Sequence, residues 1–81
     1  GLLAGIKKGQ FFTQIPNITL FAGKATKYGR NLEDVFLHLK ENENSQKVIF
    51  AEKGELLFER SAETLSEKLT LTLFNGNIVG R

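Results

Sequence analysis

Short runs in which apolar and polar residues alternate recur about every ten residues along this chain, the spacing expected for β-strands joined by turns. The clearest runs are Ile18–Ala22 and Leu69–Leu73. No long stretch places apolar residues at helical spacing. Six or seven short strands of this kind are typical of a small antiparallel sandwich, jelly roll or barrel. The sequence therefore predicts an all-β fold, an open antiparallel β-jellyroll or sandwich of short strands.

Two glycine-containing dipeptides predict tight hairpins. Lys53–Gly54 lies between two apolar runs within residues 48–58, and a two-residue loop there pairs Ala51 with Leu56. Asn75–Gly76 is the strongest hairpin dipeptide and predicts a short return strand over residues 77–79. A third turn is expected at Tyr28–Gly29.

The middle of the chain predicts a further strand over Leu32–Lys40. In it Val35, Leu37 and Leu39 face one side and Phe36 and His38 the other, while Glu33–Asp34 marks its start or a bulge. Residues 40–46 are polar throughout and predict a connection. Residues 59–67 are compatible with a helical turn capped by Ser61 or with a loop.

Composition limits the possible functions. A chain of 81 residues makes one small domain with a thin core, over residues 1–81. Its net charge of +2 is too balanced to indicate nucleic acid. No cysteine is present, which excludes disulfides and thiolate metal sites. No run approaches the roughly 20 apolar residues of a membrane span. The start at Gly1 suggests a fragment of a longer protein.

Catalytic and metal-binding constellations are not found. His38 is the only histidine, so it has neither a second imidazole for a metal nor an arrangement for nucleophilic catalysis. Glu52, Glu55 and Glu59 lie near one another in the sequence, but a solvated strand end explains them better than an acid–base pair. We expect no enzyme activity, cofactor or metal.

Several segments resemble the lipopolysaccharide export permease family LptF/LptG. The resemblance extends from about Ile6 to Gly80, with Lys8 where the family often has proline and Ile78 where an aromatic residue often follows the Asn-Gly turn. The Val35–Phe36 strand and the terminal Asn-Gly…Gly80 pattern favour the F-type subunit. The matching segments are 6–11, 15–17, 19–21, 32–36, 48–56 and 71–76.

The resemblance implies a non-catalytic open β-jellyroll on the periplasmic face of the inner membrane of a Gram-negative bacterium, inserted between transmembrane helices of its parent permease. The implied partners are lipopolysaccharide, a paralogous permease subunit, a cytoplasmic ATPase dimer, and periplasmic jellyroll bridge proteins that pair with an exposed edge strand. Lipopolysaccharide would pass along an apolar interior.

Under this hypothesis two sets of residues are candidates for lipid contact. The interior candidates are Phe21, Phe36, Phe50, Phe58, Leu71 and Leu73. The candidates for contact with lipid phosphates are Lys7, Lys8, Lys24 and Arg30. In a domain of this size most of the apolar six are expected to be needed for the core, and solvated surface charge also explains the basic four.

Two other classes of function remain open on the sequence. Basic residues near Phe11, Phe12, Phe21 and Tyr28 could form a small barrel that stacks single-stranded nucleic acid, although acidic residues interrupt the basic ones. A structural or adhesive domain would make only protein contacts through an edge strand.

Overall fold

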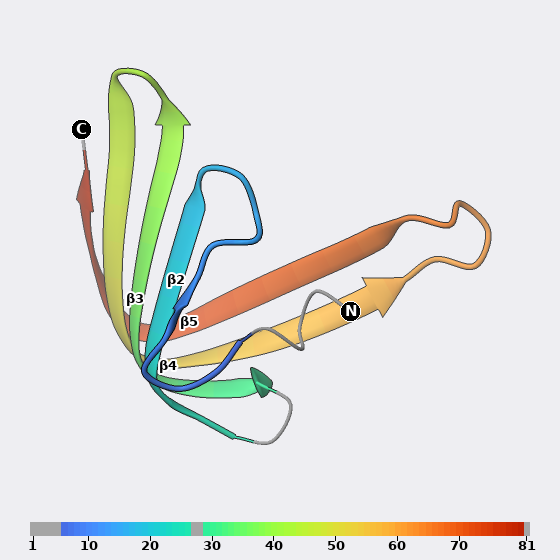
Figure 1. Cartoon of the computed structure of the whole chain (residues 1–81), viewed down its shortest axis with the longest axis horizontal. Helices are drawn as coiled ribbons and strands as arrows, with labels where there is room; N and C mark the ends of the chain where they lie inside the picture. Colours follow the sequence, from blue (N-terminus) through green and yellow to red (C-terminus); the bar gives the residue numbers. More distant parts are fainter. Residues whose placement is uncertain (1–5, 27–28, 81) are drawn as a thin grey trace.

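The computed structural model describes residues 6–26 and 29–80 and contains five antiparallel strands in one open sheet. The strands lie side by side in chain order (Figure 1). The predicted all-β antiparallel class is therefore confirmed, and the described residues include no helix that could cross a membrane. The strands are β1 (Phe11–Phe12), β2 (Ile18–Ala25), β3 (Asn31–Asn42), β4 (Ser45–Arg60) and β5 (Glu67–Gly80).

The predicted hairpins at Lys53–Gly54 and Asn75–Gly76 are wrong. β4 runs through Lys53–Gly54 without a turn, and β5 runs through Asn75–Gly76. Ala51 pairs with Val35 and Gly76 rather than with Leu56. Both dipeptides permit a turn, but here Asn75 has a left-handed backbone at a bend within β5, and Gly54 is a buried residue within β4. The sheet consequently has fewer and longer strands than predicted.

The hairpin between β3 and β4 lies instead in the polar stretch that was expected to be a loose connection. β3 ends at Asn42 and β4 begins at Ser45, which leaves a two-residue turn at Glu43–Asn44. The Asn42 side-chain oxygen accepts a hydrogen bond of 2.8 Å from the backbone N–H of Asn44. This contact is a local side-chain turn, which is why polar residues suffice there.

A line of four residues crosses the sheet where every long strand bends: Gly23, Asp34, Glu52 and Asn75. Regular pairing skips this line and resumes on both sides of it. Asp34 and Asn75 have left-handed backbone conformations, with φ of 53° and 55°. Aspartate and asparagine tolerate this region better than other side chains. Figure 1 shows the long strands changing direction together at this place.

The bend divides the sheet into two parts. Inward- and outward-facing side chains alternate along each strand in both parts, but the alternation is out of step between one part and the other. The first half-sheet comprises 18–22 of β2, 35–42 of β3, 45–51 of β4 and 76–80 of β5. The second half-sheet comprises 24–25, 31–33, 53–60 and 67–74 of the same strands.

The buried positions show how the alternation shifts. In β4 they pass from Ala51 to Gly54 and Leu56, and in β3 from Val35 to Leu32. Successive inward-facing residues are three positions apart at the bend instead of the usual two, and this spacing keeps the inner face apolar on both sides of the bend. We call the side that carries these residues the inner face.

The core lies on the inner face and is covered by the N-terminal segment, residues 6–16. Ile6 and Phe12 are buried in it, and the backbone N–H of Gly9 donates to the carbonyl of Ala22 at 2.8 Å. Gly29, with φ of 68°, lies against Ile6, where an added Cβ would come within 3.2 Å of the Ile6 Cβ. The buried apolar residues are Ile6, Phe12, Leu20, Ala22, Leu32, Val35, Leu37, Ala51 and Leu56.

Beyond Glu55 the sheet narrows to β4 and β5 alone, because Asn31–Glu55 is the last pair between β3 and β4. We call residues 56–60 with 67–71 the ribbon; it projects away from β2 and β3 in Figure 1. Its connecting loop begins with a capped turn, as the sequence allowed. The Ser61 carbonyl accepts from the N–H of Leu65 at 2.9 Å, and the Ser61 Oγ accepts from the N–H of Thr64 at 3.3 Å. The turn expected at Tyr28 lies outside the described residues.

Candidate functional site

The strongest candidate site is an apolar cleft of about 390 Å³ on the inner face, between the first half-sheet and the ribbon. The N-terminal segment supplies its third side. Every lining residue is aliphatic or phenylalanine. They are Ile6, Phe12, Ile15, Ile18, Leu20, Leu37, Leu39, Leu56, Leu69 and Leu71. A cleft without a polar side chain fits hydrocarbon, since nothing in it could hold a polar group away from water.

The structure separates the six predicted interior residues into two groups. Leu71 lines the cleft and Leu73 packs against the core, while Phe58 is half-buried and pairs with Leu69 in the ribbon. Phe21, Phe36 and Phe50 each lie between two inner-facing residues of their strand, so their side chains point to the opposite face. We call that side the outer face. The six therefore do not form one surface.

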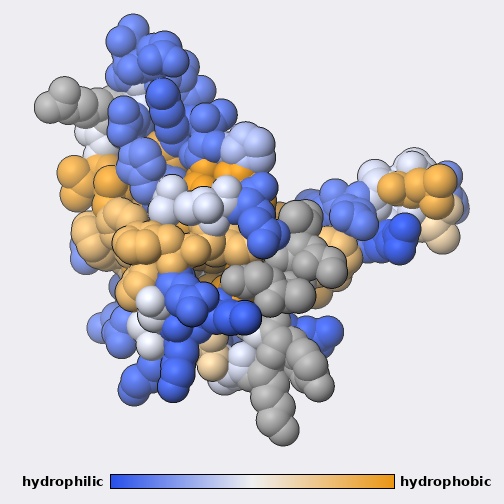
Figure 2. Space-filling view, viewed as in Figure 1, coloured by the Kyte–Doolittle hydropathy of each residue, from blue (hydrophilic) through white to orange (hydrophobic). Residues whose placement is uncertain are grey.

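On the outer face the phenylalanines form one register row across four strands. Phe11 pairs with Phe21, Phe21 with Phe36, and Phe36 with Phe50. The ring centroids of Phe11 and Phe21 are 5.1 Å apart, and those of Phe36 and Phe50 are 5.3 Å apart, both tilted. We call these four residues the phenylalanine row. Figure 2 shows apolar surface gathered in a band across the middle of the molecule, with hydrophilic surface on either side.

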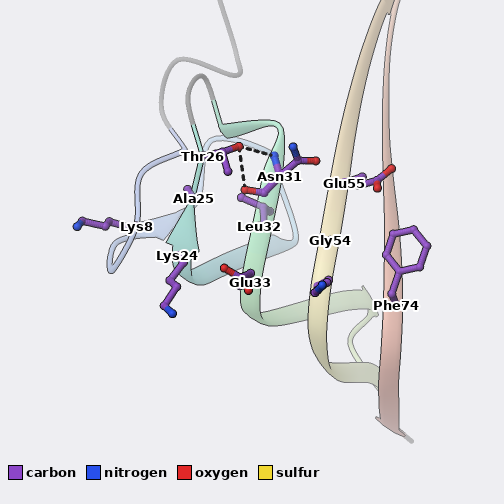
Figure 3. Close-up of a pocket in the computed structure, with 11 residues that line it drawn as sticks. Lys8, Lys24, Ala25, Thr26, Asn31, Leu32, Glu33, Gly54, Glu55 and Phe74 are labelled. Carbon is purple, nitrogen blue, oxygen red and sulfur yellow. Dashed lines mark hydrogen bonds between the residues drawn. The ribbon is translucent and has the colours of Figure 1, made fainter.

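The four basic candidates are also divided. Lys8 and Lys24 line a hollow of about 710 Å³ near the bend, and Lys7 and Arg30 do not. Figure 3 shows Lys8 and Lys24 projecting at the β2 side of this hollow, with Glu33 between them and Gly54. Lys24, Glu33 and Lys53 are successive partners in one register row. The hollow thus carries mixed charge rather than a basic cluster.

Polar contacts close the β2–β3 side of this hollow. The Thr26 side chain and backbone bond to Asn31 at 2.9–3.3 Å (Figure 3). These contacts join the end of β2 to the start of β3. Among the described residues no buried side-chain nitrogen or oxygen lacks a hydrogen-bond partner.

The titratable groups do not form a catalytic arrangement in the described part of the chain. The His38 Nε2 lies 2.8 Å from the Gln46 Oε1 on the exposed side of the β3–β4 hairpin. Lys47 bonds Glu41 at 2.8 Å, and this contact lowers the pKa of the Glu41 carboxyl. A lowered carboxyl pKa favours the folded state above the ordinary pKa and loses that contribution as the pH falls through the folded value. Residues 6–26 and 29–80 contain no group of three possible metal ligands.

Sequence reasoning missed most of the cleft. Ile6, Phe12, Ile15, Ile18 and Leu39 were not chosen, because the sequence did not reveal that the N-terminal segment crosses the inner face. The signal that could have found part of it is the alternation of Ile18 with Leu20 and of Leu37 with Leu39, which marks one face of two paired strands.

Comparison with known families gives one result. Residues 1–80 match the model of the lipopolysaccharide export system permease LptF/LptG family. The chain belongs to this family. Its members are inner-membrane permeases of lipopolysaccharide export, a transporter rather than an enzyme family. Comparisons with curated proteins and with solved structures gave no match.

Membership in the LptF/LptG family gives the apolar cleft a chemical context. Lipopolysaccharide carries several acyl chains, and an LptF/LptG domain that contacts it needs an apolar surface open to at least one side. In this family member the cleft is such a surface, whereas the hollow near the bend and the outer face each carry charged side chains.

Proposed function

We propose that this chain is the periplasmic domain of its permease and that the inner cleft carries acyl chains of lipopolysaccharide during export. The observation that supports this most directly is the lining of the cleft, in which all ten side chains are apolar. Each methylene that leaves water in such a site contributes about 0.8 kcal/mol. Partial burial of several acyl carbons would hold the lipid in the cleft and still allow it to leave, as transport requires.

The proposed route passes between the first half-sheet and the ribbon. The ribbon contributes Leu56, Leu69 and Leu71 to the cleft. Beyond the Leu56 N–H, which donates to the Arg30 carbonyl at 2.8 Å, no described residue of β3 pairs with the ribbon. Because the far end of the ribbon is free, a bulky lipid can displace it without breaking the strand pairing of the first half-sheet. Lys8 and Lys24 are the basic candidates best placed for lipid phosphates, because they share the hollow near the bend.

The exposed edge of β5 supports the proposed docking to neighbouring jellyroll proteins. β5 has 14 residues and, among the strands of residues 6–26 and 29–80, pairs with β4 alone, so its other edge presents backbone groups that none of these strands pairs with. The opposite edge of the sheet is occupied by β1, which has two residues. Strand addition to β5 would therefore extend the sheet toward a bridge protein.

The remaining parts of the proposal come from the family. The parent permease would act with its paralogous subunit and with a cytoplasmic ATPase dimer at the inner membrane of a Gram-negative bacterium. The Val35–Phe36 segment and the Asn75–Gly76…Gly80 pattern support the F-type subunit. No role for nucleic acid is proposed, because the basic residues do not gather on one face.

Site-specific photocrosslinking in the full-length permease tests the cleft. A photoreactive phenylalanine analogue at Leu69 or at Ile18 should form lipopolysaccharide adducts that increase with ATP, because both positions line the cleft and are only half-buried. The matched control is the same analogue at Phe50, which lies on the outer face of the same sheet.

Two results would contradict the proposed lipid route. One is the absence of adducts at Leu69 and Ile18 in a permease shown to be folded and active. The other is adduct formation at Phe50 alone, which would move the route to the outer face.

A further inference from the structure

The outer face of the first half-sheet carries an aromatic surface that the lipid proposal does not use. Phe11 is 65 % exposed and Phe50 is 52 % exposed, while Phe21 and Phe36 between them are half-buried. Two pairs of contacting rings in one register row across four strands form a large apolar surface for a chain of this size. Since the core lies on the other face, these rings contribute little to it.

Two carboxylates border this row on the side of the bend. Phe21, Phe36 and Phe50 line a shallow hollow of about 460 Å³ together with Asp34 and Glu52. Among residues 6–26 and 29–80 neither carboxylate forms an ion pair. The Asn75 side-chain N–H donates to the Glu52 Oε2 at 3.2 Å, and Asn75 and Asn77 complete the hollow. The contact orients Glu52 at the edge of the rings.

The position of Asp34 is also fixed. An added Cβ on Gly23 would lie 3.1 Å from the Asp34 Cβ and 3.4 Å from its Oδ2. The Asp34 side chain therefore lies over Gly23, in the space that the missing side chain leaves. Both carboxylates are held by the line of residues at which the sheet bends.

Aromatic rings beside two carboxylates form a favourable environment for a guanidinium group. The ring faces attract a cation, the carboxylates accept its N–H donors, and the planar group can stack on a ring while it forms two hydrogen bonds. A lysine would gain the charge interaction but not the planar stacking.

The charges argue against two other occupants. In a symmetric contact between two copies through this face, neither the phenylalanine row nor the line at the bend supplies a basic residue to compensate Asp34 and Glu52. An anionic membrane surface would be repelled by the same carboxylates. A basic partner has no such conflict.

We propose that the outer face is a docking surface for a segment of another protein that places an arginine between Asp34 and Glu52, with its apolar neighbours on the rings of Phe36 and Phe50. This surface is separate from the β5 edge and from the inner cleft. It does not depend on lipid binding, so it can be tested in the 81-residue chain itself.

The test is an NMR titration of the isotope-labelled chain with the synthetic peptide acetyl-Val-Arg-Val-Arg-Val-amide. Saturating shifts are expected at the backbone amides of Asp34, Phe36, Phe50 and Glu52. Replacement of both arginines by citrulline, which is planar but neutral, should raise the Kd at least about tenfold, because charge-assisted hydrogen bonds are lost.

The variant D34N/E52Q should weaken binding by a similar factor of about ten, since it removes both charges. Asparagine tolerates the left-handed backbone at position 34, and glutamine can still accept from Asn75, so the fold is retained. The control E55Q/E59Q removes the same charge elsewhere on β4 and should leave the Kd unchanged. The variant F50T should also weaken binding.

Four results would overturn the proposal. The first is no saturating shift, or shifts confined to β5. The second is equal binding of the citrulline peptide. The third is concentration-dependent association of the chain alone that F50T abolishes, which would make a second copy the occupant. The fourth is binding to phosphatidylethanolamine vesicles that D34N/E52Q abolishes while peptide binding is absent, which would make a lipid amine the occupant.

Discussion

Single residues with left-handed backbones decide where this sheet bends. Asp34 and Asn75 lie in the same line across the sheet, two strands apart, and have nearly the same φ. A β-branched residue could not adopt this conformation without strain. The bend is therefore specified by the identity of a few side chains rather than by the apolar pattern around them.

The substitution N75V should lower the free energy of unfolding by about 1–2 kcal/mol, the cost of a left-handed conformation in an ordinary residue. Urea denaturation measures it. N77V is the matched control, because Asn77 is also an exposed residue of β5 but has no positive φ. Valine favours extended backbone, so the control should be neutral or slightly stabilising. Equal losses for both variants would show that the left-handed backbone is not the cause.

Gly54 shows why residue-scale rules misled the sequence reasoning. The Lys53–Gly54 dipeptide predicts a hairpin turn, but Gly54 is buried in β4, with Leu73 and Leu71 close to where a Cβ would stand. Glycine permits a turn and also permits close packing in a sheet. The sequence does not distinguish these two uses, because the difference depends on Leu73, which is 19 positions away.

At the scale of elements, the strands themselves were easier to predict than their ends. The alternation in Ile18–Ala22 and in Val35–Leu39 correctly gave strands and their inner faces. A connection within residues 40–46 and a turn or loop within residues 59–67 were predicted, whereas the predicted hairpins at Lys53–Gly54 and Asn75–Gly76 were wrong. Glycine and asparagine give a stronger local turn signal at those two dipeptides than Glu43–Asn44 gives at the actual hairpin. The resemblance to the family gave no strand boundaries that could correct this.

The candidate site was predicted only in part for a related reason. Leu71 lines the cleft and Leu73 packs against the core, and the predicted lipid contact of both residues stays a prediction. Phe50 was grouped with them because the predicted hairpin left the two faces of β4 undetermined. Phe36 lies on β3 and faces away from Val35 and Leu37, in the predicted strand as in the structure. Once the bend is known, a step of three in the inner positions assigns every strand.

The ribbon is the element whose stability should differ most from that of the rest. Two strands without a third are marginal in water, and only the inner face of the ribbon packs on other residues. Hydrogen exchange should therefore be faster at amides of residues 57–60 and 67–70 than at 35–39, with a protection factor lower by at least about tenfold. Equal protection in both regions would mean that the ribbon opens only with the whole sheet, against the proposed displacement of the ribbon.

At the scale of the molecule, the small core makes stability sensitive to single changes. Among the described residues, nine buried apolar side chains form the core. A chain of 81 residues has a free energy of unfolding of roughly 4–12 kcal/mol. The core must hold a bent sheet and also leave the cleft open, so few of these residues can be replaced.

The substitution L32A should remove about 2–5 kcal/mol, because Leu32 is 1 % exposed and lies beside the bend. Thermal and urea unfolding would show a large loss or a chain that no longer folds at 37 °C. L65A is the control, since Leu65 is 75 % exposed in the loop of the ribbon and should change stability by less than about 0.5 kcal/mol. A small effect of L32A would mean that the core can close around the missing atoms.

The bend also separates two stretches of each long strand in which the alternation of inner and outer residues is set independently. In β4 the inner positions are odd-numbered before Glu52 and even-numbered after it, and in β5 they are likewise odd-numbered before Asn75 and even-numbered after it. A one-residue insertion within a strand of the first half-sheet would exchange the inner and outer faces of the strand residues beyond it. The same insertion at the bend could be absorbed there by a change in the spacing of the inner residues. Length variation among related chains should therefore collect at the line Gly23–Asp34–Glu52–Asn75 and in the loops, and be rare elsewhere in the strands.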